Sequence, residues 1–317
     1  MPSQRLIFMG TAELACASLE ALTNDAAFEV VAVVTQPDRP KGRDLKPQPS
    51  PVKQRAVKKQ LTVFQPARAR DAEFIEKLKS YQPDLIVVAA YGQILPPAIL
   101  ELPRFGCVNV HTSLLPKYRG AAPIQWAILN DEPETGVTIM KMDAGMDTGD
   151  ILSQTSTPIA ADDTAATLHD RLARMGATLL VETLPKYMAG KIIARPQPVE
   201  GASYARKITK EDGRVDWTQP SRTLWNRLRA FTPWPGAYFF QQTVSPPRLL
   251  KIWEATVEAR QAGPPGQILS ADKSGIVVGC GAQALRILSL QREGGRRLTA
   301  EEFLAGNPLR PGASFDQ

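Results

Sequence analysis

Cysteine and histidine, the residues that build disulfide frameworks and zinc sites, are scarce in this sequence. Its 317 residues include three cysteines and two histidines. The cysteines, Cys16, Cys107 and Cys280, are odd in number and far apart, which argues against both a disulfide framework and a zinc site. We therefore expect a protein of the reducing cytoplasm that uses no metal.

Long apolar runs are also absent. No run approaches the length of about 18 residues that a membrane-spanning helix needs. Residues 1–10 lead directly into a predicted strand, without the longer apolar core of a signal peptide. A hydrophobic content of 43% and a charged content of 22% are typical of globular proteins. We expect no membrane association, and the chain is long enough for two domains.

The net charge of +6 is unevenly distributed along the chain. Residues 36–60 contain eight Lys or Arg and two Asp, which gives this stretch a charge of +6. Residues 206–317 contain 16 Lys or Arg and 10 Asp or Glu, again +6, so the rest of the chain is negative. Two basic regions on an acidic chain indicate a polyanionic partner, although ordinary solvated surfaces would explain the same charges.

Short apolar runs predict an α/β fold in the first part of the chain. Residues 5–9 and 28–35 are expected strands on either side of a helix, and residues 84–92 form the strongest buried strand. This order predicts a Rossmann-like, doubly wound sheet, in which ligands bind at the carboxyl ends of the strands. A dinucleotide site is disfavoured, because Gly10 begins no G-x-G-x-x-G pattern.

The second part of the chain predicts a different architecture. Residues 191–208 contain two prolines and no clear periodicity, so we interpret them as a linker between a catalytic domain of residues 1–190 and a second domain of residues 209–317. About five short strands, separated by glycine and proline, predict a small β-barrel after residue 236. We expect an OB-like (oligonucleotide-binding) barrel, in which Lys251 and Arg286 are candidate nucleic-acid contacts.

An Asn-x-His pair at the end of a predicted strand is the first candidate site. Alternation places Asn109 and His111 on one face of the strand. The amide can donate a hydrogen bond to a developing oxyanion, and the imidazole can move a proton near neutral pH. Cys107 shares this face but lies at the start of the strand, so a nucleophilic thiol is the weaker alternative. The other alternative is that Asn109 and His111 are a structural pair whose hydrogen bonds are satisfied within the fold.

Three carboxylates in a glycine-rich loop downstream could complete such a site. Asp143, Asp147 and Asp150 lie close together, and any of them could orient His111 and stabilise its protonated form. Their spacing does not separate the three. The second histidine, His169, lies within a helix expected from about residue 165 to 190, and we interpret it as structural.

These motifs together resemble a known family. Asn-x-His, then Ser-Leu-Leu-Pro-x-x-Arg-Gly at 113–120 and Asp-x-Gly-x-Asp-Thr-Gly at 143–149, are similar to the folate-dependent formyltransferases. Residues 36–43 and 50–53 resemble the branch of that family that acts on methionyl-tRNA. The resemblance is dense over the first 190 residues and thinner beyond.

The resemblance implies a function and assigns residues to it. It implies formyl transfer from 10-formyltetrahydrofolate to the α-amino group of initiator methionyl-tRNA by a monomer, without a metal. Asp147 would be the carboxylate that orients His111, while Asn109 stabilises the oxyanion. The loop that contacts the folate would consist of four residues, Ser113, Leu114, Leu115 and Pro116.

A basic, proline-rich loop is the predicted contact for tRNA. Residues 36–53 contain five prolines, and from these we expect neither helix nor strand. A loop of this length is usually functional or disordered. The resemblance implies that it enters the acceptor-stem end of tRNA, with four basic residues as candidate contacts, Arg39, Lys41, Arg43 and Lys46.

Two rival functions use the same residues. One is formyl transfer to a small amine, such as an amino sugar nucleotide or glycinamide ribonucleotide. The basic loop and the basic second domain argue against it, because a small acceptor needs neither. The other is a non-catalytic RNA-binding relative, which the intact Asn109, His111 and Asp147 disfavour.

Overall fold

The computed structural model describes residues 3–41, 46–241, 246–259 and 263–315, and these form two compact units. The first unit comprises Met1–Pro123, Glu134–Pro158 and His169–Ala205. The second comprises Ile124–Pro133, Ile159–Leu168 and Arg206–Gln317. The chain therefore passes between the units several times, and the domain boundaries expected at residues 190 and 209 stay a prediction.

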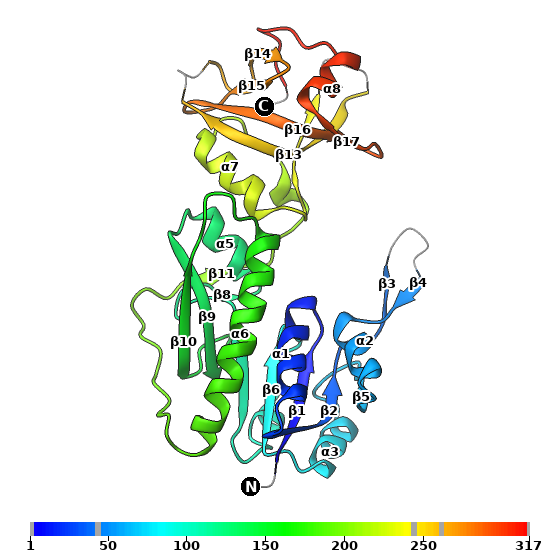
Figure 1. Cartoon of the computed structure of the whole chain (residues 1–317), viewed down its shortest axis with the longest axis vertical. Coiled ribbons are helices and arrows are strands. Elements are labelled where there is room, and N and C mark those ends of the chain that lie inside the picture. Colours follow the sequence, from blue (N-terminus) through cyan, green and yellow to red (C-terminus); the bar gives the residue numbers. More distant parts are fainter. Residues whose placement is uncertain (1–2, 42–45, 242–245, 260–262, 316–317) are drawn as a thin grey trace. The chain divides into compact units, whose positions relative to one another are not determined.

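A seven-stranded sheet forms the centre of the first unit (Figure 1), in the order β10-β9-β7-β6-β1-β2-β5. Five neighbouring strands are parallel, while β9 and β10 add antiparallel pairs at one edge. The predicted doubly wound α/β fold is confirmed. The bounds are β1 Gln4–Gly10, β2 Phe28–Val34, β5 Val63–Phe64, β6 Leu85–Ala89, β7 Cys107–His111, β9 Glu134–Lys141 and β10 Ile151–Pro158.

Helices pack against both faces of this sheet. On one face, Phe74 and Leu78 of α3 join a buried cluster with Ile86 of β6. On the other, α6 approaches so closely that a Cβ on Gly176 would lie 2.9 Å from Val110 Cγ1. The bounds of the helices before the second unit's sheet are α1 Glu13–Asn24, α2 Pro51–Lys58, α3 Ala72–Ser80, α4 Pro97–Leu100, α5 Pro123–Leu129 and α6 Ala165–Met188. No helix in the described part of the chain combines the length and the apolar character that a membrane span requires.

The proline-rich loop is more ordered than its sequence predicts. β3 (Arg39–Lys41) and β4 (Lys46–Gln48) pair as antiparallel strands, so the expectation of no strand was wrong. Pro40 lies opposite Pro47, and an isolated two-stranded ribbon tolerates this pair because its edges do not need every backbone N–H. The expectation of no helix was wrong at its end, because Ser50 caps α2 by accepting a hydrogen bond from Lys53 N.

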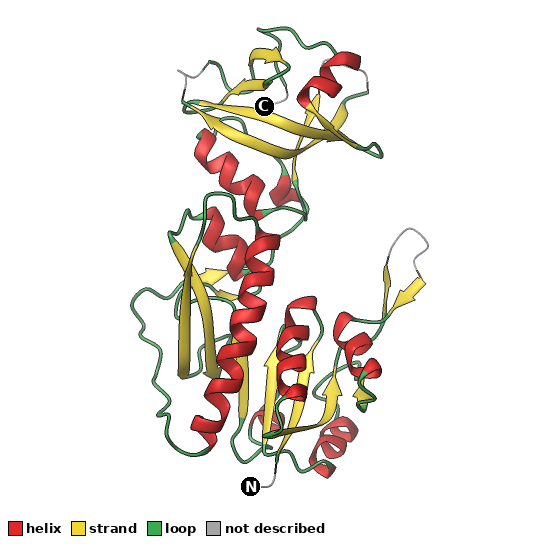
Figure 2. Ribbon diagram, in the orientation of Figure 1, coloured by secondary structure: helices red, strands yellow, loops and turns green. Residues whose placement is uncertain are grey.

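The second unit contains an antiparallel sheet in the order β12-β13-β16-β15-β14, with β17 paired to β16 (Figure 2). The predicted small β domain after the α/β domain is confirmed. The three-residue strand β17 was not expected. The bounds are β12 Ala237–Gln241, β13 Arg248–Glu258, β14 Ile268–Asp272, β15 Gly275–Gly279, β16 Ala284–Arg292, β17 Arg297–Thr299, α7 Ser221–Ala230, α8 Ala300–Gly306 and the 3₁₀ helix η1 Glu211–Gly213.

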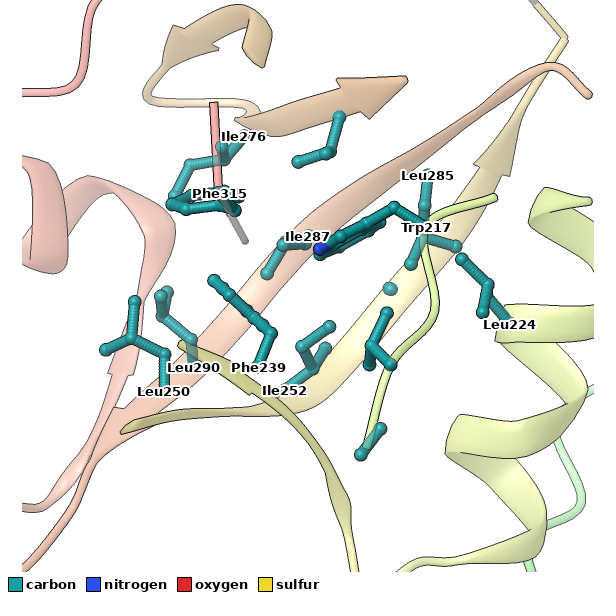
Figure 3. Packing of buried hydrophobic residues seen from close by; sticks show 14 of the residues in the cluster. Trp217, Leu224, Phe239, Leu250, Ile252, Ile276, Leu285, Ile287, Leu290 and Phe315 are labelled. Carbon is teal, nitrogen blue, oxygen red and sulfur yellow. The ribbon is translucent and has the colours of Figure 1, made fainter. Parts of the chain in front are cut away.

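Aromatic rings pack among aliphatic side chains in the core of the second unit (Figure 3). Trp217 is fully buried, with its ring edge-on to Phe239 at 5.4 Å and stacked on Phe315 at 6.2 Å. Among the residues that the structure describes, none accepts a hydrogen bond from its buried indole N–H. The contribution of Trp217 is therefore packing, while its polar atom is a cost.

We predict that Trp217→Ala lowers the free energy of unfolding by about 3–5 kcal/mol, as truncation of a buried aromatic ring does. Trp217→Phe should cost distinctly less, because it keeps a ring in the cluster and removes the unpaired N–H. Urea unfolding of the full chain measures both. Ile193→Ala, at a side chain that is 84% exposed, serves as the control and should change stability by no more than about 0.5 kcal/mol. Equal losses in the two tryptophan variants would contradict the packing account.

Candidate functional site

Asn109 and His111 lie on β7, at the carboxyl edge of the parallel strands. β7 pairs with β6 through Val88 and Asn109, so these two strands end side by side as the sequence predicted. Both polar side chains are nearly buried, on the face opposite the one that packs against α6. The alternation of β7 therefore positions an amide and an imidazole together where strand and loop meet.

One hydrogen bond fixes the protonation pattern of the His111 ring. Its Nε2 atom lies 2.9 Å from the backbone oxygen of Tyr118, which can only accept. Nε2 is therefore the atom that carries a proton in the neutral ring, and Nδ1 keeps its lone pair. Nδ1 faces the Asp147 carboxylate, with 3.7 Å between Nδ1 and Oδ2.

Asp147 joins the two residues of β7 into one cluster. Its Oδ1 accepts a hydrogen bond from Asn109 Nδ2 at 3.4 Å, and its Oδ2 accepts one from the backbone N–H of Gly120 at 2.8 Å. The side chain of His111 is 7% exposed and that of Asp147 is 18% exposed. A carboxylate, an amide and an imidazole thus converge in a partly desolvated place, where their electrostatic effects on one another are strong.

The loop between β9 and β10 explains why Asp147, among the three candidate carboxylates, points to His111. Asp143 is used within the loop, because it accepts hydrogen bonds from Thr148 Oγ1 at 2.8 and 2.9 Å and from Gly145 N at 3.0 Å. Gly149 passes so close to the backbone that a Cβ there would lie 1.8 Å from Lys141 O. The turn is therefore compact, and it presents Asp147 with a positive φ of 54°.

Residues 191–208, which we interpret from the sequence as a linker, contain a side chain that supports this cluster. The Gln197 side chain donates from Nε2 to the backbone oxygens of Asp147 at 2.8 Å and Gly149 at 2.7 Å, and its Oε1 accepts from Arg119 at 2.8 and 3.0 Å. The Gln197 amide thus connects the Asp147 loop to Arg119. The sequence carried no signal for this role, since the contact spans some 50 positions and follows no periodicity.

The same segment also holds the backbone around Arg119. β11 (Tyr204–Ala205) pairs in parallel with β8 (Arg119–Gly120). The Ser203 hydroxyl accepts a hydrogen bond from Tyr118 N at 2.9 Å. Tyr118 and Gly120 are the residues whose backbone groups bind His111 and Asp147, so residues 203–205 fix both partners of the cluster.

The predicted folate loop, residues 113–116, is partly buried and is held by hydrogen bonds to Thr138. Ser113 and Leu115 are buried, whereas Leu114 and Pro116 are partly exposed. Thr138 Oγ1 donates to Ser113 O at 2.7 Å and accepts from Leu115 N at 3.1 Å. A ligand could therefore reach the side chains of Leu114 and Pro116 more readily than those of the other two residues.

A cavity of about 600 Å³ lies against the start of the Asp147 loop. Its wall combines apolar side chains of the segment after β6 with Met142, Asp143 and Ala144, and with the polar side chains of Arg104 and Lys141. Met142 also packs against the buried cluster that contains Tyr91 and Leu95. The size suits a drug-sized organic ligand.

Cys107 has the environment of a structural thiol. It is 1% exposed, and its Sγ donates to the backbone oxygen of Ile99 at 3.5 Å. Burial raises the pKa of this thiol to about 12. The thiolate, which is the nucleophilic form, is therefore negligible at neutral pH.

The remaining predicted residues lie outside the cluster. His169 is on α6, with Nδ1 3.0 Å from Oδ1 of its neighbour Asp170. Arg39 and Lys46 are exposed on the two strands of the β3–β4 ribbon, and Lys41 ends β3. Arg43 lies outside the described residues. Within the described ranges, no group of three or more His, Cys, Asp or Glu side chains is arranged to hold a metal ion.

Known proteins resemble this chain along nearly its whole length. Residues 4–184 match the family described as formyl transferase, and residues 207–308 match the formyl transferase C-terminal domain. A methionyl-tRNA formyltransferase of Citrifermentans bemidjiense is 49% identical over 312 residues, which are 98% of this chain and 96% of that protein. One from Caldanaerobacter subterraneus subsp. tengcongensis is 50% identical over 310 residues, 97% of this chain and 98% of that protein.

Solved structures share the fold. An N-formyltransferase from Helicobacter canadensis, in complex with folinic acid and dTDP-3-aminofucose, has a TM-score of 0.65 and 22% identity, over 91% of this chain and 99% of that one. HypX from Aquifex aeolicus, in complex with tetrahydrofolic acid, has a TM-score of 0.61 and 17% identity, over all of this chain and 51% of that one. The family matches and the relatives of about half identity establish that this chain belongs to the formyl transferase family, among the methionyl-tRNA formyltransferases.

Proposed function

We propose that this protein transfers the formyl group of 10-formyltetrahydrofolate to the α-amino group of methionyl-tRNA, with the initiator tRNA as its acceptor. One observation carries the proposal. Relatives named methionyl-tRNA formyltransferase are 49% and 50% identical along the full chain, so the similarity includes both units. The cluster of Asn109, His111 and Asp147 supplies the chemistry that such a transfer needs.

The reaction begins with attack of the neutral amine on the formyl carbon. A bond forms between the α-amino nitrogen and that carbon, and the carbonyl oxygen becomes an oxyanion. Asn109 Nδ2 stabilises the oxyanion by donating a hydrogen bond from a fixed position on β7. Since the Asp147 loop holds this amide at 3.4 Å, the donor needs little reorganisation.

Proton transfer completes the reaction. The new ammonium group loses a proton, the bond between the formyl carbon and N10 of the folate breaks, and N10 gains a proton. Nδ1 of His111 is the atom that moves these protons, because Nε2 is committed to Tyr118 O. Asp147 faces Nδ1 at 3.7 Å and stabilises the protonated imidazole by its charge.

We place the folate ring system in the cavity beside Met142, Asp143 and Ala144. Apolar side chains such as Leu100 suit the flat faces of the ring, and Arg104 and Lys141 provide donors at the rim. The cavity is lined by the loop that leads to Asp147, so a ligand there lies next to the catalytic loop. Leu114 and Pro116 are the partly exposed side chains of the predicted folate loop. We assign these two side chains to donor binding as well.

The β3–β4 ribbon is the first tRNA contact in this proposal. It carries Arg39 and Lys46, both exposed, and Lys41 ends β3. Arg43, a further proposed contact, follows Lys41 in the sequence. Cations on a protruding two-stranded ribbon suit a nucleic-acid backbone. In this proposal the protein acts as a monomer in the cytoplasm, where its three buried, unpaired cysteines stay reduced.

The rival acceptors are less well supported. Solved structures with dTDP-3-aminofucose or with dTDP share the fold at about a fifth identity, which says nothing about the acceptor of this chain. The relatives of about half identity are named for methionyl-tRNA. A non-catalytic role is disfavoured because Asn109, His111 and Asp147 meet in one cluster.

We predict that His111→Ala lowers kcat for methionyl-tRNA by about 10²–10⁴-fold, the usual contribution of a general acid–base group. His169→Ala, which removes the other histidine, is the matched control and should retain kcat. Asn109→Ala and Asp147→Ala should lower kcat as well, with KM for tRNA nearly unchanged. The measurement is transfer of a labelled formyl group from 10-formyltetrahydrofolate to methionyl-tRNA. A His111→Ala enzyme with normal kcat at neutral pH would remove His111 from the mechanism.

A second prediction concerns the thiol beside the site. Because burial raises the pKa of Cys107 to about 12, Cys107→Ser should retain kcat within about threefold. Iodoacetamide should not inactivate the native enzyme, since the thiol is both buried and protonated. Loss of activity in Cys107→Ser comparable to that of His111→Ala would favour a covalent mechanism instead.

A third prediction tests the proline-rich loop of residues 36–53. Arg43→Ala should raise KM for methionyl-tRNA and reduce its dependence on salt. The slope of log KM against log salt concentration should fall by about 0.7–0.9 for each lost phosphate contact. KM for the folate should change little. Arg43→Lys should recover only part of the loss if the contact is bidentate. If deletion of the whole loop left KM for tRNA unchanged, the loop would have no role in binding tRNA.

A further inference from the structure

Gln36 lies where the β3–β4 ribbon leaves the sheet of the first unit. It comes soon after β2, which ends at Val34, and soon before β3, which begins at Arg39. The ribbon extends from this edge of the sheet (Figure 1). The two strands of the ribbon pair through three residues each, so the ribbon depends on its base for support. A side chain at this junction is placed to provide it.

The Gln36 side chain forms hydrogen bonds in two directions. Its Nε2 donates to the backbone oxygens of Tyr91 at 3.0 Å and Gly92 at 2.9 Å, in the segment that follows β6. Its Oε1 accepts a hydrogen bond from the Arg39 guanidinium at 2.5 Å. The reverse orientation of the amide would set oxygen against two carbonyls and NH₂ against a cation, so the chemistry fixes this one. One amide therefore connects the ribbon with the segment after β6.

Gly92 makes room for this contact. It has a positive φ of 84°, a conformation that favours glycine, and a Cβ added to it would lie 2.6 Å from Gln36 Nε2. A side chain at position 92 would therefore displace the amide from the two carbonyl groups. The backbone of the segment after β6 is thus shaped to receive Gln36.

The backbone of Gln36 is held as well as its side chain. Its N–H donates to Thr11 Oγ1 at 3.3 Å, and Thr11 Oγ1 in turn donates to the backbone oxygen of Tyr91 at 2.9 Å. The backbone oxygen of Gln36 accepts from Gln65 Nε2 at 2.9 Å. Because the backbone is fixed on both sides, Gln36 has little freedom to adjust. A displacement of the ribbon at Arg39 therefore acts on Tyr91 and Gly92.

The segment that Gln36 holds leads into the wall of the cavity that we assign to the folate. Leu95 is buried in the cluster against which Met142 packs, and Met142 also lines that cavity. Pro97 and Leu100, a few residues further along, line the cavity directly. Gln36 thus lies between the ribbon and the start of the cavity wall.

We infer that Gln36 is a positioning residue that couples the two substrate sites, because it connects Arg39 of the ribbon with the segment that leads into the folate cavity. The inference rests on the proposed function. The Arg39 guanidinium has five N–H groups and gives one of them to Gln36, so a phosphate can bind Arg39 without breaking this contact. Each ligand then stabilises contacts that the other also uses. The coupling is therefore positive and equal in both directions.

The test measures how strongly one ligand changes the affinity for the other. Calorimetry gives Kd for tetrahydrofolate without tRNA and with saturating deacylated initiator tRNA, and the ratio of the two Kd values is the coupling factor. Gln36→Ala removes both contacts of the amide. Gln36→Glu keeps an acceptor for Arg39 but has no donor for the two carbonyl groups. The control is Gln54→Ala, which removes an amide that donates to Pro49 O, at the other end of the ribbon. Methionyl-tRNA formylation is measured on the same preparations.

The wild type and Gln54→Ala should show a coupling factor of about five or more, and both Gln36 variants should show less than about two. Both ligands should still bind to the Gln36 variants, since the side chains that we assign to direct contact remain. A coupling factor of wild-type size in either Gln36 variant, or no coupling in the wild type, would overturn the inference even where the wild type formylates methionyl-tRNA. A wild type that shows the expected coupling yet transfers no formyl group would contradict the proposed function alone.

Discussion

The Asp147 carboxylate is the constraint on which the site depends. It accepts hydrogen bonds from the side chain of Asn109 and from the backbone of Gly120, and it faces the free nitrogen of His111. An anion in such a partly buried place is favourable only because donors surround it. The same contacts orient the amide for an oxyanion and the imidazole for proton transfer, so structure and proposed chemistry use one set of interactions.

Holding Asp147 there requires segments that are far apart in the sequence. Gln197 binds the backbone of the Asp147 loop, and β11 pairs with the short strand β8 that contains Gly120. The stretch that leads toward the second unit thus supports the proposed catalytic cluster. Substitutions in residues 195–205 would act on turnover through Asp147, although none of these side chains touches the reacting atoms in the proposed mechanism.

The sequence predicted the features that depend on local periodicity. Alternation placed Asn109 and His111 on one face, and apolar runs predicted the doubly wound sheet and the later β domain. It could not choose Asp147 over Asp143, because that choice depends on the turn that Thr148 and Gly149 make. The β3–β4 pairing and the role of Gln197 could not be predicted from the sequence either, since both depend on contacts that composition does not encode.

His111 keeps its proton on Nε2 and presents Nδ1 toward Asp147, and the proposed proton transfer depends on this. Nitrogen-15 NMR of histidine-labelled protein tests this directly, because the chain has two histidines and His169→Gln assigns the signals. We predict that the neutral His111 ring has a protonated Nε2 and an unprotonated Nδ1. A neutral ring with the proton on Nδ1 would contradict the account, since the proposed proton carrier would then be the wrong atom.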